Sequence, residues 1–472
     1  MNKSLVEKTF NYIDRYKFYL LGVVYLLLLF SHFYWDFVIT VRHSINFMEA
    51  LFTGKLGSFY VDNALIQPDN SLFHPGGPGY DMPIYLIIGI WNLPLYLLDI
   101  IGIDPLVHTI LLHWSKLQLL AILALSLYFM KRIASLIGMD KKTTEWCIFL
   151  TASSCLVMSP LLVSTQYDII AACVMMIALY NYFKKKTWGF LLWFALAATL
   201  KGFALMFFLP LLLLQEKHIM KILWKLIVVV APLIILRTLF PLTTQVQDIT
   251  TGLFMRLFSW TIPSSFYHAS VFLVLSIILW VFCYQKKPLE GIQQYSVPLY
   301  ASFTGMGLFI ATVYVYPYWV VLIAPFLYLS LFLSSKKFRI TLLLETVFTI
   351  SLTVLFQVVF YWCYDFKTIA PTLLAKLLRE VPENLLNMNP LEIISRYVSG
   401  TNIQIGMFIA SSSVVAGVVL LLWFLYPRER GNDFVTQDTV AEQMPLLIGR
   451  TVISIFTCLI PVAIYLAWVI FR

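Results

Sequence analysis

Ser164-Thr165-Gln166-Tyr167-Asp168 is a short polar segment between two apolar runs, residues 146–163 and 169–183. Burying an amide, a phenol and a carboxyl group in hydrocarbon is costly, so this segment is expected where the chain leaves a membrane. Asp36 follows the first apolar run, residues 20–33. Counting the crossings in between places both acids on the same face. The pattern therefore predicts a helical membrane protein with two carboxyl groups at one membrane surface.

The composition agrees with this prediction. Of the 472 residues, 60% are hydrophobic and only 12% are charged, whereas soluble domains contain about 25% charged residues. The net charge of +9 comes from Lys and Arg in short clusters between apolar runs, which is typical of orientation signals. A nucleic-acid partner is not expected, because it would require a continuous basic patch. The six cysteines lie in or beside apolar runs without Cys-x-x-Cys spacing, so neither a disulfide framework nor a cysteine metal site is predicted.

The basic clusters predict the topology. Basic residues before the run 20–33 indicate a cytoplasmic amino terminus, and Lys131-Arg132 marks the next cytoplasmic loop. Only one of the two apolar stretches between them, 82–103 and 106–130, can then cross. We expect 82–103 to lie at the interface, because Pro83, Pro94 and Asp99 interrupt it. Residues 36–105 become one long extracytoplasmic loop with interfacial helices.

The same alternation predicts an all-α polytopic membrane protein with about 13 transmembrane helices. Two further extracytoplasmic segments are expected at 241–268 and 364–402, the second with a helix near 373–379. Residues 431–449 should form a polar cytoplasmic linker. The chain contains no convincing internal repeat, so residues 1–472 are expected to form a single integral membrane domain.

Five short motifs follow one another along the first part of the chain. They are Asp36-Phe37-Val38 followed by Gly57-Ser58-Phe59-Tyr60, then Tyr80-Asp81-Met82-Pro83-Ile84-Tyr85, Gln166-Tyr167-Asp168, Thr199-Leu200-Lys201-Gly202-Phe203, and Tyr314-Val315-Tyr316-Pro317-Tyr318-Trp319. Their order, and the predicted side of the membrane, resemble the GT-C class of integral membrane glycosyltransferases. The closest branch is that of polyprenol-phosphate-mannose-dependent mannosyltransferases. The resemblance covers residues 1–335, and residues 336–472 add C-terminal transmembrane helices without a diagnostic motif.

The resemblance implies transfer of a hexose, by analogy mannose, from a polyprenyl-phosphate donor to a lipid, glycan or protein acceptor. The reaction would take place on the extracytoplasmic face of a bacterial plasma membrane. It also implies that Asp36 is the general base. The residue types suit this chemistry, because a carboxylate takes the proton of an acceptor hydroxyl and a lysine stabilises a departing phosphate.

Each of these residues also has a purely structural explanation. Capping of the helix that follows is the alternative explanation of Asp36, and snorkelling to water between two short apolar runs is that of Lys201. Asp168 can orient Lys201, position the acceptor or cap a helix. Solvated loop positions or interfacial anchoring explain Arg42, Arg237 and Arg256, and an interfacial belt explains aromatic residues. The residues expected to bind substrate are Asp168, Lys201, Gln166, Tyr167, Arg42, Tyr316, Tyr318, Trp319, Tyr80, Asp81 and Arg256.

No metal and no cofactor are expected. The chain lacks the paired Asp-x-Asp of metal-dependent glycosyltransferases, and a lysine can balance the charge of a phosphate instead. The expected partners are the lipid-linked donor, a glycan, glycolipid or glycoprotein acceptor, and membrane lipids. Two alternatives remain open: a lipid or polysaccharide transporter or flippase, and a non-catalytic subunit of a cell-envelope glycan assembly complex. A transporter should show mid-membrane charges and repeated halves.

Overall fold

The computed structural model describes residues 3–66, 75–263, 267–427 and 434–471. The fold is helical apart from a short antiparallel pair of strands, β1 (Thr261–Pro263) and β2 (His268–Ser270). The helices of the first half are α1 (Lys3–Leu29), α2 (Trp35–Phe52), α3 (Phe59–Asp62), α4 (Met82–Trp91), α5 (Leu93–Ile100), α6 (Leu112–Ile137), α7 (Lys141–Ala152), α8 (Cys155–Met158), η3 (Ser159–Val163), α9 (Asp168–Phe183), α10 (Thr187–Leu200) and α11 (Ala204–Gln215).

The second half continues with α12 (Ile219–Leu239), α13 (Thr244–Met255), η4 (Arg256–Phe258), α14 (Val271–Gln285), α15 (Gln293–Thr312), η5 (Pro317–Leu322), α16 (Ala324–Phe332), α17 (Phe338–Val359), η7 (Tyr361–Cys363), η8 (Phe366–Thr368), α18 (Leu373–Leu378), α19 (Pro390–Tyr397), α20 (Gly400–Leu425), α21 (Gln437–Glu442) and α22 (Met444–Phe471). The all-α class is therefore confirmed. The predicted polar linker 431–449 is partly helical, because it contains α21 and the start of α22; residues 431–433 lie outside the described part.

The expectation of about 13 transmembrane helices is wrong. Within the described residues, five helices are long and apolar enough to cross a membrane, or up to seven if each bent pair is one span. They make this a multi-pass membrane protein. Several runs counted as crossings form short apolar helices of 12–16 residues, such as α9 and α11. At 1.5 Å per residue these are about 18–24 Å long, less than the roughly 30 Å hydrocarbon core.

Two of the apolar runs are bent. Helices α4 and α5 meet at 76°, and α7 meets the α8–η3 segment at 52°. The first bend lies at Asn92, which is buried and donates from Nδ2 to Ser44 Oγ at 3.1 Å while Ser115 Oγ donates to its Oδ1 at 2.8 Å. Proline at the second position of α5 prevents the two helices from merging. The run expected to lie at the interface is thus a broken helix anchored to α2 and α6.

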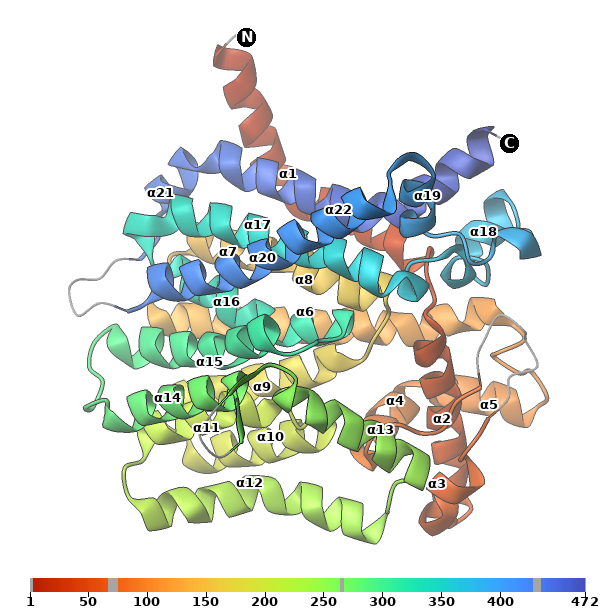
Figure 1. The fold of residues 1–472 in the computed structure, drawn as a ribbon, viewed down its shortest axis with the longest axis horizontal. Coiled ribbons are helices and arrows are strands. Elements are labelled where there is room, and N and C mark those ends of the chain that lie inside the picture. Colours follow the sequence, from red (N-terminus) through yellow and green to blue (C-terminus); the bar gives the residue numbers. More distant parts are fainter. Residues whose placement is uncertain (1–2, 67–74, 264–266, 428–433, 472) are drawn as a thin grey trace.

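The short helices α2–α5, α13, α18 and α19 gather at one end of the bundle (Figure 1). Most other helices run across the view, stacked from α22 to α12. The connections from α11 to α12 and from α14 to α15, which carry Lys217 and Lys286-Lys287, lie at the opposite end. The helices of the three segments expected on one side of the membrane therefore lie at one end of the molecule: α2–α5 from 36–105, α13 from 241–268, and α18 and α19 from 364–402.

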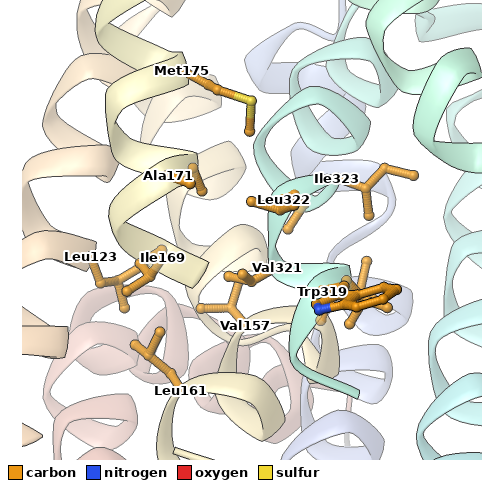
Figure 2. Packing of buried hydrophobic residues seen from close by; sticks show 14 of the residues in the cluster. Leu123, Val157, Leu161, Ile169, Ala171, Met175, Trp319, Val321, Leu322 and Ile323 are labelled. Atoms are coloured by element: carbon orange, nitrogen blue, oxygen red, sulfur yellow. The ribbon is translucent and has the colours of Figure 1, made fainter. Parts of the chain in front are cut away.

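The centre of the core is the packing of α9 against its neighbours. Every residue of α9 from Asp168 to Leu179 is buried, and α9 lies between α6 and α10. Figure 2 shows Ala171 and Met175 of α9 facing Leu322 of η5, with Val157 of α8 and Leu161 of η3 filling the space below. This packing fixes the start of α9, where the polar segment 164–168 lies. In contrast, α12 is at the edge of the bundle, and only Val229 among its residues is buried.

A fully buried ion pair joins two of the long helices. Arg450 of α22 donates from Nη2 to Glu345 Oε1 of α17 at 2.7 Å and from Nε to Oε2 at 3.0 Å. Its remaining nitrogen donates to Ser153 Oγ at 3.1 Å, and Tyr328 hydrogen-bonds to both members of the pair. A charge in the membrane interior is tolerated when its hydrogen bonds are satisfied in this way. The pair holds α22 against α17 and the α7–α8 bend.

Candidate functional site

A chain of hydrogen bonds joins three of the sequence motifs. Gln166 Nε2 donates to Asp36 Oδ2 at 2.7 Å, and the Tyr80 hydroxyl donates to Gln166 Oε1 at 3.1 Å. Asp36 is in the first turn of α2, Tyr80 precedes α4, and Gln166 precedes α9. All three motifs therefore meet at the end of the bundle where α2 begins. Asp36 and Tyr80 keep some exposure to solvent.

An ion pair lies beside this chain. Lys201 Nζ is 2.7 Å from Asp168 Oδ1, with the two side chains 15% and 3% exposed. Aromatic rings surround the ammonium group: its nitrogen lies 5.6 Å from the ring centre of Tyr80, 5.8 Å from Tyr318 and 5.5 Å from Trp319. Cation–π attraction and the ion pair both hold the ammonium group in this position. We call Asp36, Tyr80, Gln166, Asp168 and Lys201 the polar cluster.

The backbone between η3 and α9 is shaped to present the polar cluster. Thr165 has φ +43°, a left-handed conformation that is strained for a β-branched residue. The strain is held by neighbours: Tyr167, which is buried, donates its hydroxyl to the Phe37 carbonyl at 2.8 Å, and the two rings stack at 5.3 Å. Tyr167 therefore locks the α9 turn to the start of α2, and its hydroxyl does not enter the cluster.

The surroundings of Asp36 change its acidity. Desolvation is the largest influence and raises the pKa of its carboxyl group above the ordinary value, and the nearby Asp168 carboxylate acts in the same direction. The hydrogen bond from Gln166 and the charge of Lys201 oppose this shift. A carboxylate with a raised pKa is a stronger base than one in water. One oxygen of Asp168, Oδ2, is buried without a hydrogen-bond partner among the described residues, so it is available as an acceptor.

The aromatic turn before α16 connects Lys201 with a second cation. The rings of Tyr316 and Tyr318 stack with their centres 5.5 Å apart. Arg256 Cζ lies 4.8 Å from the ring centre of Tyr316 and 5.0 Å from that of Tyr314, and its Nη2 donates to the Tyr316 hydroxyl at 3.1 Å. Lys201 and Arg256 thus lie at the two ends of a stacked tyrosine pair.

An apolar groove of about 700 Å³ begins at this turn. It runs between α15, α17 and α20, and Tyr314, Phe356 and Phe408 are among its walls. Phe408 is 75% exposed, so the groove opens on the outer, apolar surface of the bundle. At its other end the groove reaches Tyr314, whose ring Arg256 contacts.

The structure places other residues of the expected site in different environments. Arg42 donates from Nη1 to Asp99 at 2.6 Å and lies 3.5 Å from Asp104, so it braces α2 against the α5 end. Arg237 of α12 forms a bidentate ion pair with Asp81: its Nε donates to Oδ1 and its Nη2 to Oδ2, each at 2.9 Å. These five charged side chains pair with one another, and among the described residues no hydrogen bond or ion pair joins them to the side chains of the polar cluster.

Sequence reasoning missed Lys116, a lysine in the second turn of α6 and inside the apolar run 106–130. Its Nζ is fully buried and donates to the carbonyl oxygens of Leu28, His32 and Leu162, each at 2.8 Å. The first two acceptors end α1 just before Asp36, and the third ends η3 just before Gln166. Lys116 therefore fixes the distance between the turn that carries Asp36 and the segment that carries Gln166 and Asp168. A lone ionisable residue inside an apolar run indicates a special role for Lys116. The three carbonyl groups that it binds could not be predicted from the sequence.

Among the residues that the structure describes, no three His, Cys, Asp or Glu side chains are grouped as metal ligands would be. The chain matches no protein-family model, no curated protein and no solved structure.

Proposed function

We propose that this protein is a membrane glycosyltransferase that moves a hexose from a polyprenyl phosphate to a hydroxyl group of an acceptor at the extracytoplasmic surface. One observation carries the proposal: four segments distant in the sequence bring a carboxylate of raised pKa, Asp36, next to a lysine, Lys201, that aromatic rings surround. A base and a phosphate-stabilising cation are the two groups that this transfer requires.

In the proposed reaction a bond forms between the acceptor oxygen and the anomeric carbon of the sugar, while the bond from that carbon to the phosphate oxygen breaks. The proton of the acceptor hydroxyl passes to the Asp36 carboxylate. The polyprenyl phosphate leaves with the electron pair of the broken bond, and Lys201 stabilises its added negative charge. Gln166 holds Asp36 in position, and the free Asp168 Oδ2 accepts a hydrogen bond from a sugar hydroxyl.

The surroundings of the polar cluster support a lipid-linked donor. The apolar groove at Tyr314 suits a hydrocarbon chain, and Arg256, 5.0 Å from the Tyr314 ring centre, suits the phosphate that would follow that chain. The stacked rings of Tyr316 and Tyr318 then lead toward Lys201 and offer apolar faces to a pyranose ring. Mannose remains the first sugar to test, by resemblance alone.

The test is sugar transfer by the purified protein in lipid nanodiscs. Polyprenyl phosphate carrying labelled mannose or labelled glucose is supplied with envelope lipids and glycans from cells lacking the gene. We expect transfer by the wild type, a loss of roughly 10²- to 10⁴-fold for Asp36→Asn, and a loss of similar order for Lys201→Ala.

Matched controls are Asp248→Asn and Lys55→Ala, because both side chains are exposed at the same end of the molecule. Both should transfer sugar within about twofold of the wild type, as expected for substitutions away from reacting groups. Full transfer by Asp36→Asn and Lys201→Ala at equal protein level would refute the proposal. Movement of the labelled lipid across the bilayer without transfer would favour a flippase instead.

A further inference from the structure

A cavity of about 770 Å³ lies at the turn between α1 and α2, just before Asp36 in the sequence. Its walls are Phe33 and Trp35 from that turn and residues of the segment 361–387. Backbone hydrogen bonds tie the two walls together: the Phe33 N–H donates to the Thr368 carbonyl at 2.6 Å, and the Leu374 N–H to the Phe30 carbonyl at 3.1 Å. The volume is within the range of about 300–1,000 Å³ for small-molecule sites.

The cavity contains the carboxyl group of Asp365, which lies at the start of η8 and of which one oxygen is unpartnered within the described part of the chain. Asp365 is 5% exposed, and its Oδ1 is buried without a hydrogen-bond partner among the described residues. Leaving a polar atom of this kind without a partner is costly. The neighbouring Thr368 uses its hydroxyl on the Asp365 carbonyl, at 2.7 Å, rather than on the carboxylate. A ligand that donates a hydrogen bond would satisfy Oδ1.

The remaining walls restrict what that ligand is. Tyr361 and Trp362 line the mouth and are 42% and 37% exposed, so their ring faces are accessible. The cavity is lined by one carboxyl group, that of Asp365, and one ammonium group, that of Lys367, so its lining is not dominated by either charge. This balance favours a neutral molecule with hydroxyl groups and an apolar face. A pyranose ring has these properties, since its C–H face stacks on aromatic rings.

We propose that this cavity binds the part of an acceptor glycan that lies next to the reacting sugar. Its position supports this assignment, because Trp35 lines the cavity and the next residue is Asp36. The identification as an acceptor site rests on the proposed glycosyltransferase function. The segment 361–387 that forms it lies outside the motifs from which the resemblance was drawn.

The experiment measures binding of neutral oligosaccharides, mannotriose and maltotriose, to the purified protein in nanodiscs by saturation-transfer NMR and by tryptophan fluorescence. We expect saturable binding of one of the two probes. Asp365→Asn and Trp362→Ala should each weaken it by roughly tenfold. The matched controls Glu383→Gln, exposed in the same segment, and Trp423→Ala, 69% exposed on α20, should leave it unchanged.

Transfer kinetics then separate binding from chemistry. Trp362→Ala should raise the KM for the acceptor with little change in kcat, because the cavity does not touch the reacting atoms; Asp36→Asn should lower kcat and keep the oligosaccharide bound. Absence of binding for both probes, binding unaffected by Asp365→Asn and Trp362→Ala, or preferential binding of inorganic phosphate would overturn the inference. If the cavity binds the oligosaccharide but the protein transfers no sugar, the proposed glycosyltransferase function is refuted. The cavity would then still be a saccharide-binding site.

Discussion

Replacing Lys116 by methionine removes three hydrogen bonds at once and keeps the volume of the side chain. The three carbonyl oxygens of Leu28, His32 and Leu162 then lose their donor in a buried site. At about 1 kcal/mol for each net hydrogen bond, the free energy of unfolding should fall by at least ~3 kcal/mol. An unfolding entropy of about 2.1 cal/mol/K per residue makes this a decrease in Tm of ~3 °C for a chain of 472 residues.

The six cysteines supply the assay. All six are free and buried, so a thiol-reactive fluorophore reports unfolding during heating. The matched control is Lys131→Met, because Lys131 is exposed on the same helix. We also expect Lys116→Met to lose sugar transfer at temperatures where it is still folded, because Asp36 is then no longer held at a fixed distance from Gln166 and Asp168. A Tm within about 1 °C of the wild type, with full transfer, would refute the reasoning.

Three further outcomes are expected in the same melting assay. Arg450→Met should cost about 3–5 kcal/mol because it leaves Glu345 buried and uncompensated, and a second substitution, Glu345→Leu, should recover much of that loss; no recovery would contradict the account. Gly305→Ala should cost about 1–3 kcal/mol, because its Cβ would lie 2.9 Å from a backbone oxygen of α11, whereas Gly406→Ala meets no atom within 4 Å and should not destabilise. Burial raises the pKa of Asp365 to about 7, so between pH ~4 and 7 the native state keeps a proton that the unfolded state has lost. Stability should therefore fall as pH rises through this window, by up to roughly 4 kcal/mol, and Asp365→Asn should lack this component; equal pH dependence of both proteins would contradict it.

The sequence was informative about the ends of helices and misleading about their number. Polar residues at the ends of apolar runs predicted which segments meet, and Asp36, Gln166, Tyr80, Asp168 and Lys201 do lie together. Hydropathy cannot distinguish a helix that faces lipid from one that faces protein. Helix α9 is buried by its neighbours and α12 is exposed, yet both are apolar, so short buried helices were counted as crossings.

The sequence also could not predict which side chains pair with one another. Arg42 and Asp81 pair with Asp99 and Arg237, at separations of 57 and 156 residues along the chain. Nothing in the local pattern distinguishes these acids from the ones in the polar cluster. The cavity at Asp365 depends in the same way on contacts between the first and last parts of the chain, which no single motif contains.

The exposure of α12 has a consequence for how its sequence can vary. Only Val229 is buried along this helix, all of which the structure describes, while Lys225 meets Glu216 at 3.1 Å near one end and Arg237 meets Asp81 at 2.9 Å near the other. Exchanging one exposed apolar side chain for another between those two charges, at Ile227, Ile234 or Ile235, leaves the buried Val229 and its neighbours in place. This helix should therefore accept random drift in its composition that the interior α9 would not survive, provided that its two charged ends are kept.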